Sequence, residues 1–178
     1  YLPHYAPWAA RIPRLMNLRN TIPGMAKMME GITGFTATRN LPTWSSKPFK
    51  NNEIEETSNP QAIIFADSFN RYFEPENLRS AVKVLKAANV SVSIAEAANG
   101  ERPLCCGRTF LAAGLVDEAK MEARRLIDAL LPHAQNSIPI IGLEPSCLLT
   151  LRDEIPRLIP GEKTKLLARQ ARMLEEYI

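Results

Sequence analysis

Short apolar runs alternate with amphipathic stretches over the last two-thirds of the chain. Three runs have the length and β-branched content of buried strands: residues 62–66, 90–95 and 138–143. Apolar positions at helical spacing predict helices over residues 74–89, 110–113, 116–131, from 146 to the prolines at 156 and 160, and 163–177. This alternation predicts an α/β fold with a small, mostly parallel sheet of three to four strands flanked by helices.

The first 60 residues do not follow this rhythm. Seven prolines and three glycines interrupt them, so we expect helical pieces only around residues 8–18 and 24–30. Residues 47–59 are polar and indicate a linker. Apolar side chains such as Trp8 and Trp44 nevertheless need cover. We therefore expect an irregular, Pro-rich N-terminal arm and linker over 1–60 that packs on another surface, and an α/β domain over 61–178.

All three cysteines of the chain follow a predicted strand. The carboxyl ends of parallel strands form the crevice in which ligands bind. The first strand ends at Asp67, the second leads through residues 99–104 to Cys105 and Cys106, and the third ends shortly before Cys147. The sequence therefore predicts that the three cysteines lie on one edge of the sheet.

Thiol chemistry is the chemistry that this edge favours. Each cysteine precedes or opens a helix, where amide groups and the helix dipole stabilise a thiolate, and Arg108 could add to this effect. Gly107 allows a sharp turn, or the close approach of a bulky ligand, after the pair. Thiolates suit iron, zinc or a disulfide substrate. Buried, inert core cysteines are the alternative.

Three cysteines are too few ligands for a typical zinc or iron–sulfur site. Structural zinc and iron–sulfur clusters usually take four protein ligands. Asp67, Ser68 or Glu144 would therefore complete the set. Two of these residues have plain alternatives, because Asp67 could cap the following turn and Glu144 could pair with Arg108 or Arg152.

Composition narrows the class of partners. The 22 Lys and Arg residues exceed the 19 Asp and Glu residues by only three and are spread along the chain, so we expect no nucleic-acid partner. The longest apolar runs fall well short of the roughly 20 residues of a membrane span. An odd cysteine count argues against a secreted disulfide framework, so we expect a cytoplasmic location, with the inner membrane reached only through partners. We interpret His4 and His133 as surface residues.

Two motifs resemble the cysteine-rich CCG domain. Residues 103–108 read PLCCGR, and residues 142–147 read GLEPSC. This domain occurs in the heterodisulfide reductase B subunit and in the iron–sulfur subunits of glycolate oxidase and anaerobic glycerol-3-phosphate dehydrogenase. Residues 65–69 and 72–76 resemble its opening strand and helix. Further stretches resemble large fusion proteins in which an FAD-linked oxidase half and a ferredoxin-like segment precede the CCG domain: residues 18–20, 39–42 and 144–154.

The resemblance implies a function for the whole parent protein. Those fusion proteins are D-2-hydroxy-acid dehydrogenases of the D-lactate, D-2-hydroxyglutarate and glycolate kind. Their flavin takes a hydride, and iron–sulfur centres pass single electrons to an acceptor such as a quinone or cytochrome. The chain, which starts at Tyr1 without Met, is then expected to be the C-terminal part of such a flavoprotein and inactive alone. FAD, a 4Fe-4S centre and the FAD-binding and ferredoxin-like portions would lie outside it.

The sequence departs from the family pattern at two strand ends. Cluster-binding members carry a cysteine where Asp67 and Ser68 stand, and a CxxC motif where residues 144–147 stand. Two of five thiols are thus absent. The resemblance leaves three options for the site: an iron–sulfur cluster with oxygen ligation, a single Fe or Zn ion, or a former site without metal. The candidate ligands are Cys105, Cys106, Cys147, Asp67 and Glu144.

Two rival functions stay open at this point. In the first, the domain is a metal-free docking module whose strand-exit pocket, with Gly107 and Arg108, contacts a substrate carboxylate or the flavin domain. In the second, it is a thiol–disulfide enzyme. The second requires Cys106 and Cys147 to lie close together and to have a lowered thiol pKa.

Overall fold

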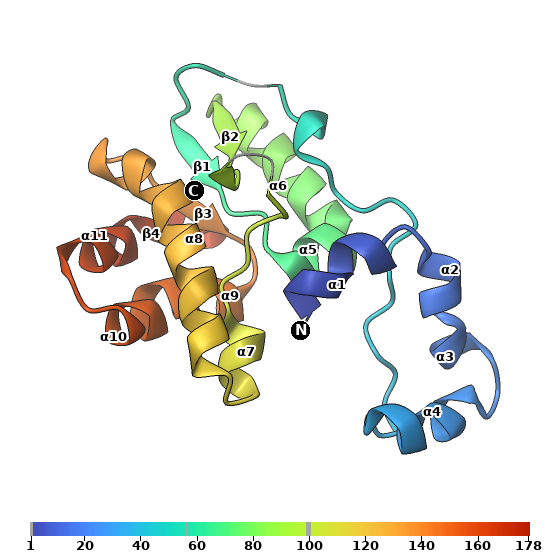
Figure 1. Cartoon of the computed structure of the whole chain (residues 1–178). Helices are drawn as coiled ribbons and strands as arrows, with labels where there is room; N and C mark the ends of the chain where they lie inside the picture. Colours follow the sequence, from blue (N-terminus) through green and yellow to red (C-terminus); the bar gives the residue numbers. More distant parts are fainter. Residues whose placement is uncertain (1, 56, 99–100) are drawn as a thin grey trace.

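The computed structural model describes residues 2–55, 57–98 and 101–178, and its centre is a parallel β-sheet (Figure 1). The strands are β1 (Ala62–Ile64), β2 (Val92–Ile94), β3 (Ile140–Gly142) and β4 (Ala171–Met173), in the order β2-β1-β3-β4. Each neighbouring pair is parallel: Ala62 pairs with Val92, Ile63 with Ile140, and Ile140 with Ala171. The predicted α/β fold class is confirmed. Residues 99 and 100 of the expected second loop lie outside the described residues, as do residues 1 and 56.

The helices after β1 follow the predicted pattern in most places. They are α5 (Ser68–Tyr72), α6 (Pro75–Ala87), α7 (Arg108–Ala112), α8 (Val116–Gln135), α9 (Pro145–Leu149), a π-helical turn (Thr150–Glu154), α10 (Ile155–Leu158), α11 (Glu162–Gln170) and α12 (Leu174–Tyr177). None of the helices in the described part of the chain combines the length and the hydropathy that a membrane span requires.

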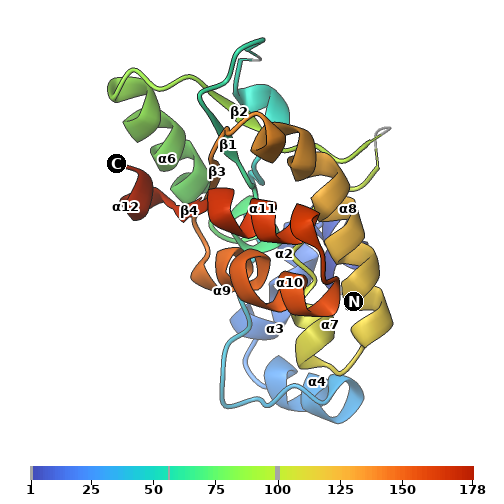
Figure 2. The same ribbon diagram turned by 90° about the vertical axis from the view of Figure 1, so that its left-hand side faces the viewer.

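The sheet is covered on both faces. Successive side chains of a strand point to opposite faces, so Ile63 packs with Leu126 and Leu130 of α8, while Ile64 packs with Leu78 of α6. Figure 2 shows α6 on one side of the strands and α8 on the other. A continuous apolar run is therefore the expected pattern for β1, because both of its faces are buried.

Two expectations about the C-terminal third are wrong. Residues 163–177 do not form one helix, since β4 interrupts them: Ala171 and Met173 are buried against the sheet and their backbone pairs with β3. This pairing at the sheet edge outweighs the local helix propensity. Pro156 does not end the helix that begins near residue 146. It lies in the first turn of α10, where its missing N–H is tolerated, directly after the π-helical turn.

The N-terminal segment is more helical than its prolines suggest. It contains α1 (Leu2–Ala9), α2 (Pro13–Met16), α3 (Leu18–Thr21), α4 (Met25–Thr33) and the 3₁₀ turn Asn51–Glu53. Ala6 and Ala9 of α1 pack with Trp44 and Tyr72, and the backbone N–H of Ser45 donates to the carbonyl of Tyr72 at 2.9 Å. The segment thus contacts α5. Trp8, by contrast, is 60 % exposed.

Candidate functional site

The three cysteines meet at the carboxyl edge of the sheet, as the strand order predicts. Cys105 and Cys106 lie just before α7, and Cys147 lies in the first turn of α9. The Sγ atoms of Cys106 and Cys147, 41 residues apart in sequence, are 3.1 Å from each other. All three are free thiols and at most 5 % exposed. The site is therefore a compact group of buried thiols drawn from two segments.

The environment of the site raises the pKa of each thiol. The pKa of Cys105 rises because its sulfur is hydrogen-bonded to Cys106 and because it is buried. A hydrogen bond with Cys105 lowers the pKa of Cys106, but the contact with Cys147 and burial together outweigh it. For Cys147, the hydrogen bond with Cys106 lowers the pKa, while burial and the nearby charges of Asp67 and Glu144 raise it more.

The expectation that helix starts would favour thiolates is therefore reversed. Burial raises the pKa of all three thiols, and thiol contacts add to it for Cys105 and Cys106, so the metal-free thiols are protonated at neutral pH. The thiol–disulfide enzyme required both proximity and a lowered pKa for Cys106 and Cys147. The structure supplies only the proximity.

The two candidate carboxylates cap helices. Asp67 precedes α5: its Oδ1 accepts from the backbone N–H groups of Phe69 (2.9 Å) and Asn70 (3.1 Å), and its Oδ2 accepts from the Asn70 side chain (2.7 Å). Burial nevertheless raises the pKa of Asp67. Glu144 precedes α9 and accepts from the hydroxyl of Ser146 at 2.7 Å. Both carboxylates act on Cys147, so they belong to the site, and their role as metal ligands stays a prediction.

Two substitutions of Asp67 distinguish the stability that its helix cap contributes from the effect of its bond to the Asn70 side chain. Asp67→Ala should lower the free energy of unfolding by about 1–2 kcal/mol, because the N–H groups at the start of α5 lose their acceptor. Asp67→Asn should cost less, because asparagine is an equally good cap and loses only the bond to the Asn70 side chain, whose NH₂ would meet another NH₂. Urea denaturation measures both. A loss in Asp67→Asn as large as that in Asp67→Ala would show that the bond to Asn70, and not the cap, carries the stability.

Gly107 and Arg108 connect the cysteine pair to α8 and to the π-helical turn. Gly107 has a left-handed backbone (φ 80°), and a Cβ atom there would lie 3.0 Å from the backbone oxygen of Ala119 on α8. The predicted sharp turn is present, and the close approach is to α8. The half-exposed guanidinium of Arg108 pairs with Glu154 in the π-helical turn. Binding of a cofactor by Gly107 and Arg108 stays a prediction.

Glu122 is an essential part of this region that the sequence analysis missed. It is 2 % exposed, yet its carboxylate pairs with Arg102 through both oxygens and with Arg125 at 3.1 Å. Arg125 also donates to the carbonyl of Arg102 at 2.6 Å. These bonds tie the segment before Cys105 to α8. A signal was present, because Glu122 occupies an apolar-face position of α8 between Ala119 and Leu126.

His4 and His133 differ in their surroundings. His4 is half-exposed, with its Nε2 4.0 Å from Glu122 and its ring edge-on to Phe110 at 5.5 Å. His133 lies in the last turn of α8, where burial lowers its pKa. Neither histidine reaches the thiols through an interaction among the described residues.

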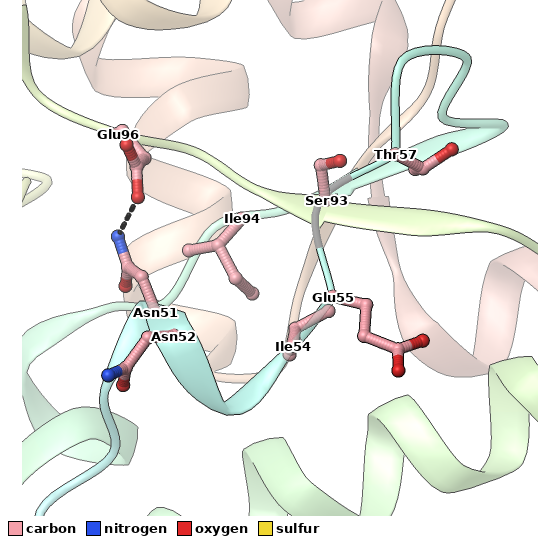
Figure 3. Close-up of a pocket in the computed structure, with 8 residues that line it drawn as sticks. All are labelled: Asn51, Asn52, Ile54, Glu55, Thr57, Ser93, Ile94 and Glu96. Carbon is pink, nitrogen blue, oxygen red and sulfur yellow. Dashed lines mark hydrogen bonds between the residues drawn. The ribbon is translucent and has the colours of Figure 1, made fainter.

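A separate polar cavity lies beside the edge strand β2. Figure 3 shows it between the 3₁₀ turn and β2, where the Asn51 side chain donates to Glu96 at 2.7 Å. Its volume is about 540 Å³, and its lining includes the carboxylates of Glu55 and Glu96. The described lining residues include none of the five predicted metal ligands, so the cavity is distinct from the thiol site.

The donor set matches a thiophilic metal in chemistry more closely than in geometry. Sulfurs that share a tetrahedral ion at 2.3 Å lie roughly 3.8 Å apart, whereas Cys106 and Cys147 are in direct contact at 3.1 Å. As placed, no group of three or more His, Cys, Asp or Glu side chains in residues 2–55, 57–98 and 101–178 could hold a metal ion. Three converging thiols are nevertheless the soft ligands that iron, zinc and iron–sulfur clusters take.

Comparisons with protein-family models, curated proteins and solved structures find no match for this chain. The resemblance to the CCG domain therefore rests on sequence motifs alone, chiefly those at residues 103–108 and 142–147. The chemistry of the site is argued from its geometry.

The raised thiol pKa values predict a loss of stability in alkali. An unfolded thiol has a pKa of about 8.5. Because the folded-state values are higher, stability is fully present below that pH and decreases as the pH rises above it. Each protonated buried thiol should contribute a slope of about 1.4 kcal/mol per pH unit in metal-free protein.

Urea denaturation between pH 8 and 10.5 measures this slope. Cys147→Ser removes one thiol and should reduce the slope by about 1.4 kcal/mol per pH unit. An unchanged slope in this variant would contradict the raised pKa of the Cys147 thiol.

Proposed function

We propose that the chain is an electron-transfer domain of a larger FAD- and iron–sulfur-dependent oxidoreductase, and that Cys105, Cys106 and Cys147 hold a metal ion or a cluster. One observation carries the proposal: three reduced, buried thiols from two segments far apart in sequence converge at the carboxyl edge of the sheet. Contact with a neighbouring thiol and burial raise the pKa of Cys105, and contact with Cys147 and burial raise that of Cys106. A bound cation would displace their protons and stabilise the resulting thiolates.

The residues around the thiols suit this role. The backbone N–H of Gly107 lies 3.5 Å from the sulfur of Cys105, and the N–H of Arg108 bonds to Cys106. Such N–H···S bonds stabilise negative charge on sulfur and set the reduction potential of iron–sulfur centres. A cluster or iron ion would supply one-electron transfer. Asp67 or Glu144 would provide an oxygen ligand.

The parent reaction follows from the family resemblance. It is the oxidation of a D-2-hydroxy acid of the D-lactate, D-2-hydroxyglutarate or glycolate kind, with FAD and a 4Fe-4S centre in the other portions of the protein. The partners of this domain are then the FAD-binding and ferredoxin-like portions and an acceptor such as a quinone or cytochrome. We place this protein in the cytoplasm.

A metal-free docking module is the second candidate. The direct contact between the sulfurs of Cys106 and Cys147 favours it, because ligands of one ion lie farther apart. In that case the carboxyl edge of the sheet would contact the flavin portion or a substrate carboxylate, and the thiols would serve packing.

Reconstitution distinguishes the two candidates. The reduced chain is incubated without oxygen with Fe²⁺ and sulfide, or with Zn²⁺, desalted and analysed for metal. We expect retained metal in the wild type and at least a tenfold loss in Cys106→Ser and Cys147→Ser, because each removes a ligand. Leu149→Ala is the matched control, since it shortens an exposed side chain of α9 without removing sulfur or a carboxylate. Equal metal in wild type and both cysteine variants would overturn the proposed site.

A further inference from the structure

A second cavity, of about 620 Å³, lies where the N-terminal segment meets α5 and α7. Tyr5 of α1 and Trp44 form part of its wall, and Phe69 of α5 and Thr109 of α7 form part of its base. Figure 1 shows α1 against α5 in this region. Its volume falls within the range of small-molecule sites, roughly 300–1,000 Å³.

The lining of this cavity is aromatic and uncharged. Five rings contribute, and several are mutually packed: Trp44 lies 4.5 Å from Phe73, and 6.0 Å from Tyr5, between ring centroids. None of the described residues that line it carries a charge. An ionised ligand would lose its hydration here without gaining a partner. A flat, neutral ring, in contrast, would bury its faces against aromatic side chains.

One polar group in the lining lacks a partner. The hydroxyl oxygen of Thr109 is buried and has no hydrogen-bond partner among the described residues. An unsatisfied buried hydroxyl is costly, so it is a feature that needs an explanation. As placed, this oxygen is shielded from solvent, so it would reach a ligand only after rotation about χ1 to the second rotamer that threonine takes in helices. A ligand oxygen would then accept the hydrogen bond.

We propose that this cavity binds one neutral, planar ring compound that carries a carbonyl oxygen. The rings of Trp44, Phe69 and Phe73 contact the faces of the compound, and the hydroxyl of Thr109 donates to its carbonyl. The assignment is independent of metal at the thiols. Its base nevertheless shares α5 and α7 with the segments that follow Asp67 and Cys106.

Two matched probes test the assignment on the full chain. 2-Acetylnaphthalene has the ring and the carbonyl, and 2-ethylnaphthalene has nearly the same shape without the oxygen. Equilibrium dialysis should give a Kd on the order of 10–100 µM for the ketone. The hydrocarbon should bind about threefold to tenfold more weakly, because it leaves Thr109 unpaired.

Variants locate the binding. Thr109→Val should raise the Kd of the ketone about threefold to tenfold and leave the Kd of the hydrocarbon unchanged. Ala112→Phe, at an exposed position of the lining, should fill the cavity and weaken both probes at least tenfold. Ala87→Phe adds the same ring to an exposed position of α6 and should change the Kd of neither probe.

Three results would overturn the proposal. The first is no binding of the ketone up to its solubility limit. The second is binding that Ala112→Phe leaves unchanged. The third is dimerisation of the chain that Ala112→Phe abolishes, because a second copy and not a small ring would then occupy the cavity.

Discussion

Replacing Glu122 with alanine is expected to lower the free energy of unfolding by about 3–5 kcal/mol. The carboxylate is buried and pairs with Arg102 and Arg125. Its removal leaves the partly buried guanidinium of Arg102 without a charged partner, whereas Arg125 keeps Glu101 at 2.8 Å. An unpaired, largely buried charge costs more than the pair contributes. Urea denaturation followed by circular dichroism measures the loss.

The same substitution should also expose the thiols. The pair of Glu122 and Arg102 ties the segment before Cys105 to α8. Alkylation of native, metal-free protein should therefore be faster in Glu122→Ala than in the wild type. Asp128→Ala, at an exposed position of the same helix, is the control and should stay within about 0.5 kcal/mol of the wild type. A loss below 1 kcal/mol for Glu122→Ala would show that the arginines find other partners.

Gly107→Ala is expected to cost about 2–5 kcal/mol. Part of the cost is the left-handed backbone, about 1–2 kcal/mol for a residue with a Cβ atom. The rest is overpacking, about 1–3 kcal/mol, because that Cβ would lie 3.0 Å from the backbone oxygen of Ala119 and 3.3 Å from the Cβ of Glu122. Backbone cannot give way as a flexible side chain can.

Gly114 offers a matched control for this prediction. It has a similar left-handed backbone (φ 75°), and a Cβ there would meet nothing within 4 Å. Gly114→Ala should therefore lose only the backbone term, about 1–2 kcal/mol. Thermal or urea denaturation of both variants isolates the contact with α8. Equal losses would mean that α8 moves away from residue 107 at no cost.

The sheet could be predicted where local pattern and tertiary context agree. The apolar run at 62–66 is buried on both faces, and its neighbours at 90–95 and 138–143 pair with it in parallel. β4 could not be predicted, because Ala171–Met173 lies within a stretch of good helix formers. Only pairing with β3 and burial against the sheet make it extended.

The position of the thiol site could be predicted from the sequence, but the pKa values of its thiols could not. Strand order alone brings Cys106 and Cys147 to one edge. The direction of their pKa shift depends on burial and on thiol–thiol contact, which sequence does not report. The cap formed by Asp67 was among the alternatives that the sequence offered, and its bonds to the N–H groups of Phe69 and Asn70 confirm it. Glu122 was hidden because a carboxylate on an apolar face is explained only by its arginine partners.

The most direct test of the central claim is the metal and sulfide content of the wild-type chain purified without oxygen, with its visible absorption spectrum. The account predicts bound iron with matching acid-labile sulfide and a sulfur-to-iron absorption band. Zinc near one ion per chain would support metal binding by the thiols but contradict electron transfer, because Zn²⁺ has no redox chemistry. A folded chain that holds neither metal while Cys105, Cys106 and Cys147 are reduced would contradict the account and favour the metal-free docking module.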